Sequence, residues 1–131
     1  MDKVLSEKEE AVAIWRQIEA LSRELETPDS ALTHFIRVSC TYGRIKFEVI
    51  QHGWAVMLMG LKGERSGRYD HDAISKHIAA YDLAWVEWKA LFAGNPDCPT
   101  LYRDVYFMGD KPGLGASVNK YRKLIEANTK L

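Results

Sequence analysis

Apolar residues recur at intervals of three and four along most of this 131-residue chain, which is the spacing of one face of an α-helix. The first run lies between Ser6 and Pro28, and Ser6 with Glu9 has the pattern of a capping box at a helix start. Pro28 ends the run, because proline cannot continue a helix. The predicted first helix carries one apolar stripe, made of Ala11, Ile14, Trp15, Ile18, Leu21 and Leu25.

A second run covers residues 31–61, which hold no proline. It follows the tight connection Thr27-Pro28-Asp29-Ser30, whose Thr or Asp is expected to cap the next helix. An uninterrupted helix of this length would extend about 46 Å at 1.5 Å per residue. Gly43 or Gly53 is therefore expected to mark a bend or to allow close helix packing. Residues 44–49 alone also fit a strand, but their flanks keep the helical period. The predicted face comprises Leu32, Phe35, Ile36, Ser39, Tyr42, Val49, Ile50, Trp54, Met57, Leu58 and Leu61.

Glycines and prolines divide the rest of the chain. Residues 60–67 contain three glycines and are predicted to form a mobile surface loop. Asp70 is expected to cap a third long helix, which ends at Gly94-Asn95-Pro96. The stripe of this helix comprises Ile74, Ile78, Tyr81, Trp85, Trp88 and Phe92.

Residues 94–115 hold several glycines and prolines and are predicted to form an irregular connection. A short amphipathic helix over residues 116–128 then closes the chain. The sequence therefore predicts an all-α fold, an up-and-down bundle of three long helices plus a short C-terminal helix. A chain of this length forms one domain, residues 1–131.

Charge and cysteine content limit the classes of partner that the chain is expected to bind. Lys and Arg number 18, as do Asp and Glu, so no net field favours nucleic acid. The charged opening Met1-Asp2-Lys3 leads us to expect no signal peptide in this chain, and no run reaches the ~20 apolar residues that span a bilayer. The chain is expected to be soluble and not to bind a membrane. Cys40 and Cys98 form no CxxC pair, and either one bridge or two free thiols fits.

Candidate catalytic and metal-binding groups are incomplete. Glu48 and His52 share a helix face, but a third ligand at a defined spacing is lacking. The carboxylates of Asp70-His71-Asp72 suit the positive end of a helix. Residues 109–117 are rich in glycine, yet they follow neither the dinucleotide-binding nor the Walker pattern. The sequence predicts no catalytic residue, no metal site and no cofactor.

Aromatic residues are the most function-like feature. The rings of Trp54, Trp85 and Trp88 can stack on sugars or planar ligands, although their place on helical stripes favours core packing. A second aromatic segment, residues 102–107, lies in the irregular connection and could bind a protein chain or a small apolar ligand. The candidate ligand-binding residues are Trp54, Trp85, Trp88, Tyr102, Arg103, Asp104 and Tyr106.

Three stretches carry a resemblance to a known class of protein. They are Tyr81-Asp82-Leu83-Ala84-Trp85-Val86-Glu87-Trp88, Asn95-Pro96-Asp97-Cys98-Pro99-Thr100-Leu101-Tyr102, and Pro112-Gly113-Leu114-Gly115-Ala116-Ser117-Val118 with Tyr121-Arg122. Together they resemble the C-terminal helical region of large bacterial glycoside hydrolases. The resemblance implies a non-catalytic module that braces a catalytic domain or places aromatic side chains near a carbohydrate. It also implies an exported parent protein and thereby favours a bridge between Cys40 and Cys98.

Two functions are weighed against this accessory module in a carbohydrate-processing context. One is a stand-alone helical protein that binds a protein partner or a small apolar ligand through the aromatic segment Tyr102–Phe107. The other, which the sequence favours least, is a helical enzyme that uses Glu48, His52 or Asp82 in a pocket.

Overall fold

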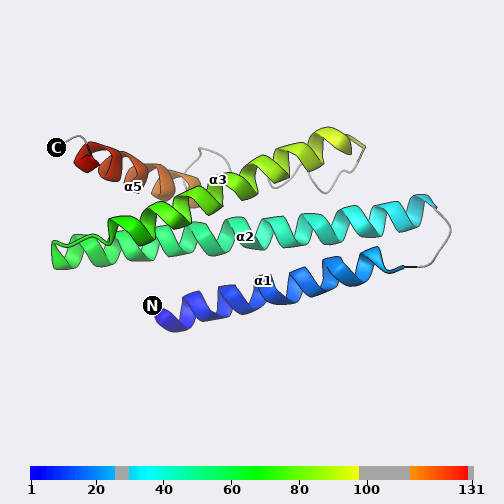
Figure 1. Ribbon diagram of the computed structural model, residues 1–131, viewed down its shortest axis with the longest axis horizontal. Helices are drawn as coiled ribbons and strands as arrows, with labels where there is room; N and C mark the ends of the chain where they lie inside the picture. Colours follow the sequence, from blue (N-terminus) through cyan, green and yellow to red (C-terminus); the bar gives the residue numbers. More distant parts are fainter. Residues whose placement is uncertain (26–29, 98–112, 130–131) are drawn as a thin grey trace.

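The computed structural model describes residues 1–25, 30–97 and 113–129, and these form four helices that run alternately up and down (Figure 1). The helices are α1 (Asp2–Arg23), α2 (Ala31–Ser66), α3 (His71–Gly94) and α5 (Leu114–Thr129). The predicted all-α bundle of three long helices and a shorter C-terminal one is confirmed. Within the described ranges no helix has both the length and the apolar character needed to cross a bilayer.

Helix α2 is the centre of the bundle, because every other helix packs on it. Helix α1 lies along one side of α2, and α3 and α5 lie along the other (Figure 1). The apolar core forms on the side of α3 and α5. Its buried members are Ile45, Val49, Val56, Ile74, Ile78, Tyr81, Ala84, Trp88, Val118 and Tyr121. The predicted stripe of α3 is confirmed, since Trp85 and Phe92 pack against the same cluster.

The start of α1 differs from the prediction. The helix begins at Asp2, so Ser6 and Glu9 lie inside it and the predicted capping box is wrong. Asp2 places a negative charge in the first turn, where the helix dipole stabilises it.

The caps of the next two helices are side-chain oxygens. Ser30 caps α2 by accepting a hydrogen bond from the Thr33 backbone N–H at 3.2 Å, so the predicted Thr or Asp is one to three residues too early. Asp70 caps α3 as predicted, accepting from the backbone N–H of Ala73 at 3.0 Å.

The predicted loop over residues 60–67 is wrong, because α2 continues as one helix to Ser66. The helix ends at Gly67, whose φ of 69° lies in the left-handed region that glycine adopts without strain. Residues 44–49 are also helical, which removes the strand alternative.

The glycines of α2 are contact points for large side chains. A Cβ added at any of four glycines would overlap a neighbouring side chain. These contacts join Gly43 to Trp15, Gly53 to Leu114, Gly60 to Tyr121, and Gly63 to Tyr69. The predicted close packing at Gly43 or Gly53 is confirmed, and it extends to two glycines that were assigned to a loop.

Two predicted stripes face the core only in part. On α1, Ile14 and Leu21 are 49% and 63% exposed, and the buried residues are Val12, Glu19 and Ser22. The predicted face of α2 is likewise wrong at its start, because Leu32 is 67% exposed. The inward face of α1 is polar because Glu19 pairs with a buried arginine of α2, as described below.

Gly60→Ala is expected to lower the free energy of unfolding by about 1–3 kcal/mol, the usual range for overpacking. The added methyl group would meet the ring of the buried Tyr121, and this outweighs the better helix propensity of alanine. Urea unfolding followed by circular dichroism measures the effect.

Gly94→Ala is the matched control, because a Cβ at Gly94 has no neighbour within 4 Å. Its free energy of unfolding should stay unchanged or rise slightly. Equal destabilisation by both variants would show that Gly60 is not a packing contact.

Candidate functional site

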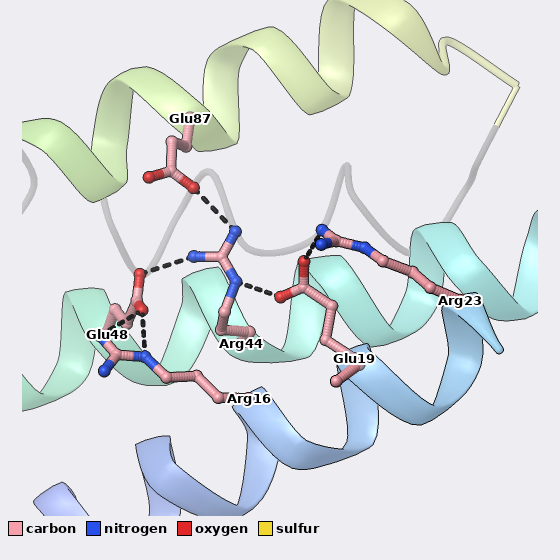
Figure 2. Close-up of a pocket in the computed structure, with 7 residues that line it drawn as sticks. Arg16, Glu19, Arg23, Arg44, Glu48 and Glu87 are labelled. Atoms are coloured by element: carbon pink, nitrogen blue, oxygen red, sulfur yellow. Dashed lines mark hydrogen bonds and ion pairs between the residues drawn. The ribbon is translucent and has the colours of Figure 1, made fainter.

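Six charged side chains gather where α1, α2 and α3 meet, and we call them the charge cluster (Figure 2). They are Arg16, Glu19 and Arg23 of α1, Arg44 and Glu48 of α2, and Glu87 of α3. Together with Ala20 they line a cleft of about 400 Å³. This cleft is the first candidate site, because it is concave and rich in carboxylates.

The guanidinium of Arg44 lies at the centre of the charge cluster. Its Nη2 donates to Oε2 of Glu87 at 2.8 Å, and its Nη1 donates to Oε2 of Glu48 at 2.8 Å. Its Nε donates to Oε2 of Glu19. One side chain thereby connects α1, α2 and α3 through three charge-assisted hydrogen bonds, which are the strong kind.

The inner part of the charge cluster is buried. The side chain of Arg44 is 16% exposed, and that of Glu19 is 5% exposed. Burial by itself lowers the pKa of Arg44, but hydrogen bonds to Glu87 and Glu19 and the charge of Glu48 raise it above its ordinary value. Arg44 is therefore a cation, as arginine is throughout the ordinary pH range of proteins.

Two exposed arginines complete the pairing. Arg16 donates to Oε1 of Glu48 from Nη2 at 3.0 Å and from Nε at 3.1 Å, and Arg23 pairs with Glu19. Both carboxylate oxygens of Glu19 and of Glu48 thus accept from arginine. With three arginines and three glutamates, the cleft has no formal net charge to attract an ion.

The groups proposed for a pocket enzyme are held apart by other contacts. Glu48 belongs to the charge cluster, whereas His52 contacts His77. Asp82 binds Arg122 of α5 through two hydrogen bonds of 2.7 Å. The candidate Glu48–His52 pair that the sequence offered is therefore not formed, and no three metal-binding side chains come together in the described ranges.

His52 and His77 face each other from α2 and α3, with 3.0 Å between their Nδ1 atoms. One Nδ1 must donate and the other accept, which requires a neutral acceptor ring. The pKa of His52 is lowered to about 4, mainly by burial and to a smaller extent by the charges of His77 and Arg16. Burial also lowers the pKa of His77, and the charge of Glu9 opposes this shift.

The structure brings together two of the three predicted tryptophans. The rings of Trp85 and Trp88 lie 5.0 Å apart, and Trp88 stacks on Phe92 at 5.8 Å. Trp88 is only 4% exposed, and Trp85 is half-buried. Trp54 is also half-buried, and its contact is Nζ of Lys8, 6.0 Å from its ring centroid.

Other predicted residues lie beyond the part of the chain that the structure describes. These are Tyr102, Arg103, Asp104, Tyr106 and Cys98. Cys40 is a free, half-buried thiol of α2.

An exposed apolar surface covers the end of the α1–α2 hairpin, and we call it the hairpin surface. Its members are Ile14, Ile18, Leu21, Leu25, Leu32, Phe35 and Ile36, which are between 36% and 67% exposed. Arg37 joins the two helices here, donating to the backbone carbonyls of Ser22 at 3.3 Å and Leu25 at 3.2 Å. Exposed apolar residues that gather in this way are typical of binding surfaces.

The sequence contained a signal for this surface that was assigned to the core instead. Ile14, Ile18 and Leu21 of α1 follow intervals of four and three, the narrow stripe of a coiled-coil seam, and Leu25 lies four positions further on, just past the end of the helix. The polar residues Glu19 and Ser22 recur on the neighbouring face, which is the one that α1 buries.

No family model, curated protein or solved structure matches this chain. Its function is therefore inferred from the charge cluster, the tryptophans and the hairpin surface.

The free energy of unfolding is expected to fall as the pH falls from about 6.5 to about 4. The folded pKa of His52 lies below its unfolded value of 6.5, so the unfolded chain binds more protons in this interval. This contribution is fully present above pH 6.5 and is lost towards pH 4. Urea unfolding across this pH range measures it.

His52→Gln should remove part of this pH dependence, because the glutamine amide does not titrate. His34→Gln is the control, since the exposed His34 contacts Asn95 at the far end of α3. A pH dependence unchanged by His52→Gln would contradict the assignment.

Proposed function

We propose that this chain is a non-catalytic helical interaction module that binds a protein through the hairpin surface. The observation that carries the proposal is the set of seven large apolar side chains, 36% to 67% exposed, on α1, on the first turns of α2 and at Leu25 just after α1. Exposing this much apolar surface at one place costs free energy unless a partner covers it.

The charge cluster supports the non-catalytic part of the proposal. An enzyme that uses carboxylates needs at least one with a free oxygen facing the substrate. All three carboxylates of the charge cluster accept from Arg44: Glu19 and Glu48 have both oxygens bound by arginine, and Glu87 has one. Their geometry suits a structural link between helices.

The carbohydrate-processing context is a further part of the proposal. It is based on the resemblance of residues 81–122 to the helical region of glycoside hydrolases. Trp54 and Trp85 are the rings available to a glycan, because each is half-buried while Trp88 is buried. Such rings can stack on the apolar face of a sugar.

Titration with a panel of glycans is expected to shift the tryptophan emission of the wild-type chain in a saturable way. Trp85→Phe should reduce the shift, and Trp88→Phe, which alters a buried ring, should retain glycan binding. No shift with any glycan would contradict the carbohydrate context and leave protein binding as the function.

A photo-cross-linking amino acid placed at Leu21 is expected to form a covalent adduct with a protein in cells that express the chain. The control position is Leu83 of α3, which is 61% exposed, against 63% for Leu21, but lies outside the hairpin surface. Mass spectrometry identifies the adducts. Adducts at neither position, or at both equally, would contradict binding through the hairpin surface.

A further inference from the structure

We infer that the partner of the hairpin surface is a second copy of this chain, so that the protein forms a two-fold symmetric dimer. This inference rests on the proposed function, because it names the occupant of the surface through which the module binds. It is carried by the area, spacing and charge of that surface.

The area of the hairpin surface matches a small homodimer interface. The exposed fractions of its residues leave on the order of 600 Å² uncovered, the upper end of the range for the largest apolar patch on a monomer. Two such surfaces facing each other would bury about 1,200 Å², above the ~1,000 Å² that a specific interface needs. Polar residues around the edge would add to this area.

The spacing on α1 favours a helical partner with the same pattern. Ile14, Ile18 and Leu21 of α1 have the four-and-three spacing of a coiled-coil seam, and such a seam is complementary to a second seam of the same kind. A second copy supplies this seam, and it also supplies Leu32 and Ile36 on the adjacent helix. Pairing two hairpins about a two-fold axis brings four helices together, which is a common arrangement.

The charge of the chain permits two copies to approach. Its formal net charge is 0 at pH 7, so two copies do not repel each other as a whole. All seven members of the hairpin surface are uncharged, so pairing buries no charge among them.

The chain cannot cover the α1 seam by turning α1 inward. Such a rotation would pull Glu19 away from Arg44 and would remove one of the three carboxylates that the Arg44 guanidinium binds. Association between copies covers the seam while it preserves the charge cluster.

Sedimentation equilibrium of the purified chain tests the inference. The mass is expected to approach twice 14.9 kDa as the concentration rises. Leu21→Arg should weaken the dimer by about 30-fold or more, the effect of losing an interface hot spot. Leu83→Arg should behave as the wild type, because Leu83 has similar exposure outside the surface.

Leu32→Arg on α2 is a second disrupting variant, used if Leu21→Arg does not give the helical circular dichroism of the wild type. A monomer at every concentration, or equal weakening by Leu21→Arg and Leu83→Arg, would overturn the inference. A monomeric chain that still forms a cross-link to another protein at position 21 would overturn the inferred dimer but would leave the proposed function intact. A monomeric chain without any adduct would overturn the proposed function as well.

Discussion

The pairing of Arg44 with three carboxylates determines how α1 lies on the bundle. Helix α1 contributes only Val12 to the buried apolar residues, so apolar packing alone does not fix its orientation. Glu19 does, because it meets the Arg44 guanidinium of α2, which also binds Glu87 of α3. Turning α1 away would cost Arg44 one of its three carboxylates, so this pairing favours the orientation in which the polar face of α1 points inward.

This constraint divides the bundle into an apolar half and an ionic half. On one side of α2, the side chains of α3 and α5 pack into a core that includes Trp88 and Tyr121. On the other side, α1 contacts α2 through the charge cluster and through Trp15, which fits against Gly43 and stacks on Phe47. Ile14, Ile18 and Leu21 of α1 are left exposed, and this links the internal charge pairing to the proposed binding function.

The sequence predicted the fold class, the Asp70 cap and the α3 stripe, because each depends on residues close together in the chain. It did not predict the face that α1 buries, since Glu19 and Arg44 are 25 positions apart and their pairing depends on tertiary structure. Gly60 and Gly63 were assigned to a loop because glycine is a poor helix former. Their role depends on Tyr121 and Tyr69, which only the folded chain places against them.

The central claim is that the contact between Glu19 and Arg44 orients α1, and a double-mutant cycle measures that contact most directly. Urea unfolding of the wild type, Glu19→Gln, Arg44→Gln and the double variant gives the coupling free energy of the two side chains. The account predicts a favourable coupling of about 1–3 kcal/mol, as found for contacting residues in one network. A coupling near zero would mean that α1 is oriented by other contacts and would contradict the account.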